Sequence, residues 1–220
     1  LSTFLHKALF HDCVYAWDAL KKIESYLRMQ KLGNIEVGIP DGAHLIHPEL
    51  ISIGKGTIIE PGAYIKGPCI IGEECQVRQG AYIRGNVIVG NHCVVGHDTE
   101  MKSVIMLDHA NAAHFAYLGD SILGNRVNLG AGTKCANLRL DHGEVILHLD
   151  GERIPTGLKK LGAILGDDTQ LGCNSVTNPG TVTGKAVFCY PCVNFGGVVP
   201  AKSVIKHAQP PVIVPHERNA

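Results

Sequence analysis

The chain is poor in aromatic residues, carries no net charge and contains no long apolar run. Aromatic residues make up 5% of its 220 residues, and Trp occurs once. Lys and Arg number 20, as do Asp and Glu, so the formal net charge is zero. This balance argues against nucleic acid or an anionic membrane as a partner. Because no apolar run reaches the roughly 18 residues that cross a bilayer, we expect no membrane-spanning helix.

The eight cysteines do not read as a disulfide scaffold. Cys69, Cys75 and Cys93 occupy small positions of the repeat described below, where a thiol serves as a compact apolar filler. These positions favour a reducing compartment, and we expect a cytoplasmic protein. Cys189 and Cys192 form a CxxC motif, but both lie within the same repeat, so we expect no metal site there.

The dominant pattern in the chain is a period of six residues. From Ile53 to Leu107 an aliphatic residue stands at every sixth position, and the fourth residue after it is usually small. This period fits neither a helix nor an alternating strand, but it fits one flat face of a triangular coil of about 18 residues. The 26 glycines suit the corners of such a coil. The pattern therefore predicts an all-β protein built as a parallel β-helix.

The rest of the chain divides around this repeat. Apolar residues recur at three- and four-residue intervals from about Leu5 to Met29, which predicts an amphipathic helix that covers an open end of the coil. A Pro- and Gly-containing linker follows from Lys31 to Glu49. The expected units are a helix and linker at 1–50, the β-helix at 51–207 and a Pro-rich tail at 208–220. The tail is expected to be extended and to reach a neighbouring subunit.

Two segments interrupt the repeat. The run from Asp108 to Tyr117 does not fit the period, which predicts a loop at 108–117 that leaves the coil. The segment 138–161 alternates polar and apolar residues around Asp150-Gly151, which predicts an inserted β-hairpin. Loops that interrupt a rigid solenoid are natural places for function.

Three basic residues recur at the length of one coil. Lys66, Arg84 and Lys102 are each 18 residues apart, so they should stack on one face. Like charges directly opposite each other are destabilising, and a bound anion such as a phosphate would explain the column. The alternative is that the three side chains simply extend into water. The first interruption follows directly and carries His109 and His114, candidates for a general base beside the anion.

The string AHFAYLGDSILGNRVNLGAGT, from Ala113 to Thr133, resembles the acetyltransferase half of the bifunctional bacterial enzymes that acetylate and then uridylylate glucosamine 1-phosphate. YIR at 82–84 and EMK at 100–102 fall at the spacing of that family, and the likeness covers roughly 53–201. The later GERIPTGLKKLGAILGDD is similar to standalone relatives labelled sugar-phosphate nucleotidyltransferase-like. The resemblance implies a left-handed parallel β-helix with an N-terminal α-helix, which associates as a homotrimer.

The resemblance also implies a function. It implies an N-acetyltransferase that uses acetyl-CoA as co-substrate and acts on an amino-sugar 1-phosphate or a nucleotide-linked amino sugar. His114 would be the catalytic base, and Arg84 and Lys102, with Lys66 added from the column, would hold the phosphate. The remaining implied residues are Tyr117, Asn128 and Asn137, which orient the sugar, and Ala131, whose N–H region donates to the oxyanion. Each also has a structural alternative: Tyr117 could pack against the loop, Asn128 could bond to backbone groups at a corner of the coil, and Asn137 could cap the insert.

The chain departs from that family in two respects. A substrate-contacting lysine of the family has no clear counterpart, and the sequence leaves open which basic residue replaces it: Arg139, Arg153, Lys159 or Lys160. The roughly fifty residues before the coil are also too few for a nucleotidyltransferase domain. Two late lysines, Lys202 and Lys206, are candidates for the CoA phosphates, although solvated side chains are the expected role for them.

Two other functions compete with acyl transfer. Gamma-type carbonic anhydrases use the same coil with a histidine-bound zinc, and His92/His97 and His109/His114 have a matching gap. However, Gly56 and Glu73 stand where the third ligand of that family would be, so we expect no metal. A non-catalytic or regulatory solenoid is the other alternative. A purely structural coil would have no reason to keep the candidate site residues, which are Arg84, Lys102, His114, Tyr117 and Asn128.

Overall fold

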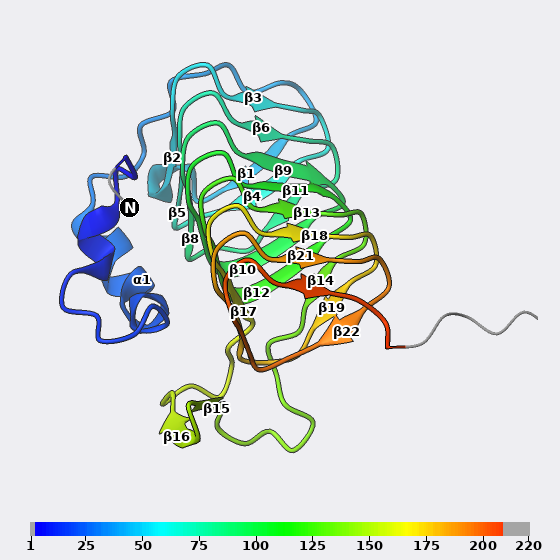
Figure 1. Cartoon of the computed structure of the whole chain (residues 1–220). Helices are drawn as coiled ribbons and strands as arrows, with labels where there is room; N and C mark the ends of the chain where they lie inside the picture. The colour runs from blue at the N-terminus through cyan, green and yellow to red at the C-terminus, as the bar shows by residue number, and fades with distance from the viewer. Residues whose placement is uncertain (1–2, 209–220) are drawn as a thin grey trace, which may run out of the picture.

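Short parallel strands stack into three flat faces in a computed structural model that describes residues 3–208 (Figure 1). The site face, which carries the candidate residues discussed below, contains β1 (His44–Ile46), β4 (Tyr64–Lys66), β7 (Tyr82–Ile83), β10 (Glu100–Met106), β12 (Tyr117–Leu123), β14 (Lys134–Cys135), β19 (Val176–Thr177) and β22 (Asn194–Phe195). The helix face contains β2 (Ile51–Ile53), β5 (Cys69–Ile71), β8 (Val87–Val89), β17 (Ala163–Leu165), β20 (Thr181–Thr183) and β23 (Val198–Val199), together with the ends of β10 and β12. The third face contains β3 (Ile58–Ile59), β6 (Gln76–Val77), β9 (Val94–His97), β11 (Asn111–His114), β13 (Asn128–Leu129), β18 (Gln170–Leu171), β21 (Phe188–Cys189) and β24 (Val204–Ile205).

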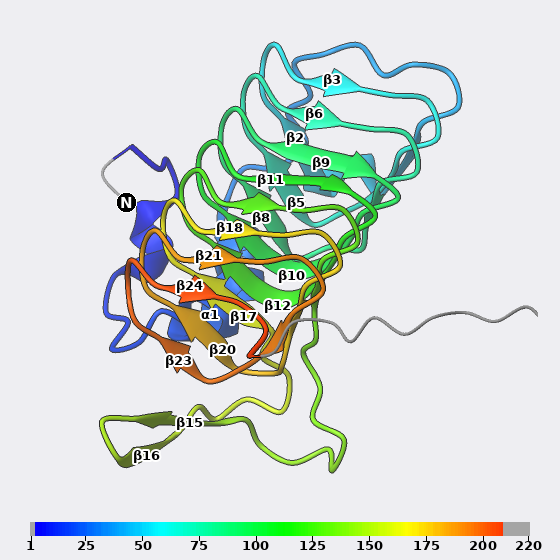
Figure 2. The same ribbon diagram turned by 45° about the vertical axis from the view of Figure 1, so that its right-hand side comes forward.

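The coil is left-handed. Figure 2 shows the strands of the third face running from left to right in front while successive coils descend, and the chain returns behind them. The prediction of a left-handed parallel β-helix with an N-terminal helix is therefore confirmed.

The six-residue period produces the core. Ile53, Ile71 and Val89 are paired in register on neighbouring strands, and all three are buried. The small positions are buried as well, and burial raises the pKa of the Cys69 thiol to about 12, as expected for an inert filler. The CxxC motif is split, because Cys189 is buried and Cys192 is exposed at a corner.

The predicted loop at 108–117 is wrong, because this segment belongs to a coil that is one residue short. Met101 pairs with Ile83, 18 residues earlier, whereas Val104 pairs with Val87, only 17 residues earlier. The corner between them has lost one residue. The chain then continues as β11, paired with both β9 and β13. The period therefore appears broken in the sequence although backbone pairing is uninterrupted.

The shortened corner also changes which aliphatic residue faces inward. Met106 pairs with Val89 and continues the inner column. Leu107, which the period of six assigns to the core column, packs instead in the cluster under the N-terminal helix. The two residues are adjacent and both are apolar, so the sequence pattern does not separate them.

The β-helix begins before residue 51, so most of the predicted linker is also wrong. Ile35 forms a parallel bridge with Ile53, and β1 pairs with β4. A short 3-10 helix, η2 (Pro48–Leu50), turns the chain from β1 into β2. The segment after the helix is therefore already the first coil.

The predicted helix at 5–29 is two separate pieces. They are a 3-10 helix, η1 (Lys7–Phe10), and the α-helix α1 (Asp18–Met29). His11 is extended and Asp12 has φ 57°, which ends the first piece. The Asp18 carboxylate accepts the Tyr15 N–H and helps to fix the start of the second.

The helix α1 covers a side of the coil and not an open end. The helix face presents an outward column of aliphatic residues, which includes Ile88, Ile105, Ile122 and Ile164. Ile23 and Leu27 of α1 belong to the same buried cluster. Figure 1 shows α1 lying alongside this face. Because the outward isoleucines would otherwise be exposed to water, the helix is needed on this side.

An antiparallel hairpin, β15 (Ile146–Leu149) and β16 (Glu152–Pro155), lies inside the range 138–161 and projects from the coil (Figure 2). Asp150 and Gly151 both have positive φ, as a two-residue hairpin turn requires. The described part of the chain contains no helix long and apolar enough to cross a bilayer. The predicted Pro-rich tail lies, except for residue 208, outside the described residues.

Candidate functional site

The basic column stacks on the site face as its spacing predicts. Lys66 ends β4 directly after Ile65, which is in register with Ile83 on β7 and, through it, with Met101 on β10. Arg84 and Lys102 are the residues that follow these two partners. Lys66 and Arg84 are exposed and Lys102 is half-buried.

An acidic residue that the sequence analysis did not single out neutralises the middle of this column. Glu100 Oε1 lies 2.7 Å from Arg84 Nη1, and both side chains are partly exposed. The column is therefore not a stack of like charges alone. The EMK string contains Glu100, so its position was visible in the sequence, but its pairing with Arg84 was not.

Tyr117 and Asn137 meet over the position that continues the basic column. Gly119 is the register partner of Lys102. A Cβ on Gly119 would lie 2.4 Å from Asn137 Nδ2 and 2.8 Å from Tyr117 Oη. The glycine is thus required for both polar groups to approach the surface of the site face.

Asp120 is the second acidic residue that the sequence analysis missed. Its carboxylate accepts a hydrogen bond from Asn137 Nδ2 at 2.6 Å. Burial raises the pKa of Asp120, while the bond from Asn137 and the charges of Lys102 and Lys160 oppose the rise. Of the four basic residues left open by the sequence, Lys160 is the one whose charge lowers the pKa of Asp120. It also forms an antiparallel bridge with Leu138 where the insert leaves and rejoins the coil.

A groove of about 480 Å³ runs beside these residues. Glu100, Tyr117 and Asn137 line it, and burial raises the pKa of the Tyr117 hydroxyl. The other lining residues are Asp98, Phe115, Ala116, Lys134, Ala136, Leu138 and Val176. Two of the predicted site residues, Tyr117 and Asn137, thus face the same groove.

His114 lies on the neighbouring face. It is the last residue of β11 and is exposed, with its Cα in register with that of His97. Its ring centroid is 6.0 Å from that of Phe115, which lines the groove. Within residues 3–208 no hydrogen bond or ion pair joins His114 to Arg84 or Lys102. The candidate base therefore stands across one edge of the prism from the basic column.

Asn128 and Ala131 lie on the same side as His114. Asn128 begins β13 on the third face, and its register partner on β11 is Asn111. Ala131 follows at the corner, where the Gly132 N–H donates to the His114 carbonyl. Among the described residues no backbone carbonyl accepts the Ala131 N–H.

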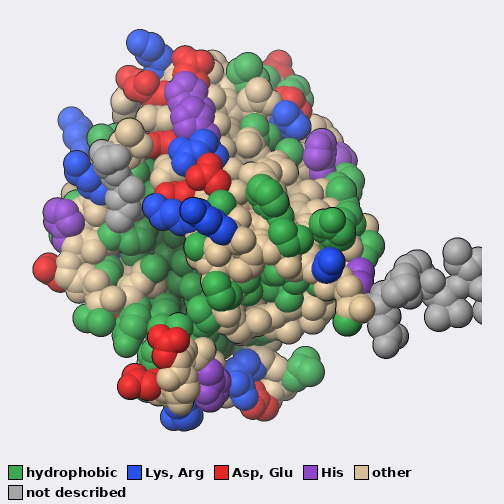
Figure 3. Space-filling model, in the orientation of Figure 1, with side chains coloured by type: hydrophobic (Ala, Val, Ile, Leu, Met, Phe, Trp, Pro, Cys, Tyr) green, Lys and Arg blue, Asp and Glu red, His purple; other side chains and the backbone are tan. Residues whose placement is uncertain are grey.

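The two members of each histidine pair that matches the gap of a zinc site lie apart on the third face. The rings of His92 and His109 stack in parallel with centroids 4.7 Å apart, at the opposite end of their strands from His97 and His114. Figure 3 shows histidine side chains gathered with charged ones along an edge of the coil. Residues 3–208 contain no group of three or more His, Cys, Asp or Glu side chains placed to hold a metal.

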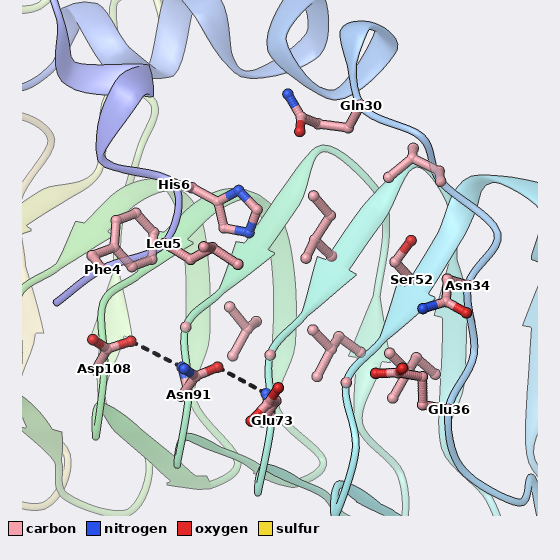
Figure 4. A pocket seen from close by; sticks show the side chains of 18 of the residues that line it. Phe4, Leu5, His6, Gln30, Asn34, Glu36, Ser52, Glu73, Asn91 and Asp108 are labelled. Atoms are coloured by element: carbon pink, nitrogen blue, oxygen red, sulfur yellow. Dashed lines mark hydrogen bonds between the residues drawn. The ribbon is translucent and has the colours of Figure 1, made fainter.

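A second cavity, of about 460 Å³, lies between the N-terminal segment and the coil (Figure 4). Asp108 accepts the Asn91 N–H, and the Asn91 side chain accepts the Glu73 N–H. Thr3 Oγ1 also donates to Asp108. None of the eight predicted site residues lines this cavity. Its polar groups tie the N-terminal segment to the edge of the coil.

Comparison with known proteins gives one family match. The model of the GMPPB C-terminal domain family matches residues 65–214. The chain is similar to the "Bifunctional sugar-1-phosphate nucleotidylyltransferase/acetyltransferase" of Sulfurisphaera tokodaii, with 33% identity over 181 residues, 77% of this chain and 41% of that protein. It is similarly related to "Bifunctional protein GlmU" of Methanococcus maripaludis, with 33% identity over 182 residues, 81% of this chain and 43% of that protein. The chain thus spans less than half the length of these relatives.

Among solved structures, the Arabidopsis UDP-N-acetylglucosamine acyltransferase is similar with a TM-score of 0.47 and 12% identity. That match covers 76% of this chain and 67% of the other.

Proposed function

Because the chain belongs to the family of the GMPPB C-terminal domain, we propose that it transfers the acetyl group of acetyl-CoA to the amino group of a phosphorylated amino sugar. The names of the two relatives support this proposal, since one includes a sugar-1-phosphate and an acetyltransferase activity and the other is a GlmU protein. The chain covers 41% and 43% of them. Support for this activity therefore has to come from the residues of this chain.

The observation that carries the proposal is the placement of the basic column beside a groove. Arg84 and Lys102 follow register-paired residues on adjacent strands of the site face. Tyr117 and Asn137 meet over the next position of the same column. Strands stacked at about 4.8 Å bring neighbouring side chains within reach of one phosphate group. A sugar held by its phosphate at this column would extend along the groove.

Each polar group near the groove has a proposed role in holding the sugar. Arg84 and Lys102 bind the phosphate, and Lys160 completes the positive charge around Asp120. Asp120 holds the Asn137 amide through its 2.6 Å hydrogen bond. That leaves the Asn137 carbonyl oxygen and the Tyr117 hydroxyl to orient sugar hydroxyl groups.

His114 and Ala131 serve the reacting end of the substrate. The sugar amine attacks the thioester carbonyl of acetyl-CoA, and His114 accepts the proton that the amine loses. The new C–N bond replaces the C–S bond, and the CoA thiolate leaves and takes a proton. The Ala131 N–H stabilises the oxyanion of the tetrahedral intermediate that forms between attack and departure. We further propose a homotrimer, on the family resemblance alone.

The test is the release of free thiol from acetyl-CoA in the presence of amino-sugar acceptors. The panel contains glucosamine 1-phosphate, galactosamine 1-phosphate and nucleotide-linked amino sugars. We expect thiol release that depends on both the amino group and the phosphate of the acceptor. If no acceptor supports release with acetyl-CoA or a longer acyl-CoA, the chain is a non-catalytic solenoid.

A further inference from the structure

An aromatic column runs beside the basic column on the site face. His44, Tyr64 and Tyr82 are register partners on β1, β4 and β7. The ring centroids of His44 and Tyr64 are 6.3 Å apart, and those of Tyr64 and Tyr82 are 5.3 Å apart in an edge-to-face arrangement. The Tyr82 side chain is 43% exposed. Cross-strand packing explains the contact between the two tyrosines, but it does not require exposed rings.

The aromatic and basic columns lie side by side. Side chains two residues apart on a strand point to the same side of a sheet, so Tyr64 accompanies Lys66 and Tyr82 accompanies Arg84. The Arg84 guanidinium carbon lies 5.9 Å from the centroid of the Tyr82 ring. These two coils therefore each offer one aromatic ring and one cation to the same ligand.

The aromatic and basic columns together form a strip, and this strip is continuous with the groove of the candidate site. Glu100 is the register partner of Tyr82, and Tyr117 is the register partner of Glu100. Both Glu100 and Tyr117 line the groove. A ligand whose sugar occupies the groove can therefore extend over Arg84 toward Tyr82 and Lys66 without leaving the site face.

The length of the basic column exceeds what one phosphate needs. Three side chains stacked at about 4.8 Å per strand span about 9.6 Å. A single phosphate between Arg84 and Lys102 leaves Lys66 without an anion, and Lys66 forms no ion pair within residues 3–208. A diphosphate uses all three cations, and it places whatever it carries next beside Tyr64 and Tyr82.

We propose that this strip binds the nucleoside diphosphate part of a nucleotide-linked amino sugar. One phosphate lies at Arg84 and Lys102, the other at Lys66, and the base stacks on the exposed face of Tyr82. Base–aromatic stacking accepts any base, so the strip selects a nucleotide without selecting its identity. The sugar-acetylating role of the neighbouring groove rests on the proposed function, whereas nucleotide binding by the strip does not.

The first experiment measures the binding of UDP and GDP by isothermal titration calorimetry. Tyr82→Leu and Lys66→Ala should each weaken binding by about 5- to 100-fold, while Tyr82→Phe keeps the ring and should bind like the wild type. Tyr190→Leu and Lys55→Ala are matched controls, because both side chains are exposed outside this strip. Binding that is absent in the wild type, or unchanged in Tyr82→Leu and Lys66→Ala, overturns the inference.

The second experiment compares acetylation of a nucleotide-linked amino sugar with that of the corresponding sugar 1-phosphate. Tyr82→Leu should lower kcat/KM for the nucleotide-linked acceptor and leave the sugar 1-phosphate within about twofold. Equal losses on both acceptors overturn the inference. Tyr82-dependent nucleotide binding without any acetylation would refute the proposed function and support the strip. Acetylation of sugar 1-phosphates without nucleotide binding would support the proposed function and refute nucleotide binding by the strip.

Discussion

The guanidinium of Arg84 and the carboxylate of Glu100 are joined at 2.7 Å across neighbouring strands of the β-helix. A phosphate that binds Arg84 must therefore compete with a carboxylate that is already in place. The pair is partly exposed on both sides, and such pairs contribute about 0–1 kcal/mol to stability. The pair therefore affects the binding of a phosphate more than the stability of the fold.

Replacing Glu100 should strengthen anion binding. In Glu100→Gln the guanidinium loses its competing partner, so the KM for a sugar phosphate should fall by about two- to fivefold. The melting temperature should barely change. Steady-state kinetics and thermal unfolding of the same preparation check both statements. A higher KM would mean that Glu100 itself holds the substrate.

His114 should be needed for turnover but not for folding. Its side chain is exposed at the end of β11, so His114→Ala should keep the melting temperature of the wild type. Loss of a general base should lower kcat by about 10²–10⁴-fold. His97→Ala is the matched control, because His97 is its register partner on β9. Equal losses in the two variants would remove the proposed role of His114.

A methyl group at Gly119 should disturb the sugar site. In Gly119→Ala the Cβ would meet Asn137 Nδ2 at 2.4 Å and Tyr117 Oη at 2.8 Å, so both groups must move. We expect kcat/KM to fall about tenfold or more, because a displaced hydrogen bond is worth roughly 1–3 kcal/mol. Gly38→Ala is the control, since nothing lies within 4 Å of its added Cβ. Unchanged kinetics would show that Tyr117 and Asn137 do not contact the substrate.

The attachment of the N-terminal segment should weaken in acid. His6 is buried and lies 2.9 Å from the Tyr26 hydroxyl, and burial lowers its pKa from 6.5 although Asp108 partly opposes this. The unfolded chain therefore binds the proton more readily, so this contribution is complete above about pH 6.5 and is lost as the pH falls through the lower folded pKa.

Melting temperatures measured from pH 7.5 downward check this, with His6→Phe as the test variant. The variant should lose part of the acid-dependent decrease seen in the wild type. His148→Phe, on the exposed hairpin, should retain it. An identical pH dependence in His6→Phe and the wild type would exclude His6 as the titrating group.

The regular part of the fold could be predicted from the sequence because every coil repeats the same requirement. An inward aliphatic residue such as Ile71 recurs with each face, and the basic column follows from the same spacing. The shortened coil could not be predicted, because Met106 and Leu107 are both apolar and either fits the core. The separation of the N-terminal helix into two pieces could not be predicted either, because the helical periodicity of the sequence continues across His11 and Asp12.

The candidate site could be predicted only in part. Arg84 and Lys102 lie on one face, as their spacing indicated, and Tyr117 and Asn137, which only the resemblance indicated, meet beside them. His114 lies in β11 across an edge of the prism, whereas the break in the period of six predicts a loop there. The roles of Glu100 and Asp120 depend on side-chain contacts between strands, and a search for phosphate-binding residues does not select carboxylates.

The most direct test of the proposed acyl transfer is the mass spectrum of a glucosamine 1-phosphate reaction with acetyl-CoA, run with the wild type, His114→Ala and His97→Ala. We predict an N-acetylated sugar phosphate from the wild type and from His97→Ala, and almost none from His114→Ala. Acetylated product formed equally well by His114→Ala, or formed by none of the three with any phosphorylated amino sugar, would contradict it.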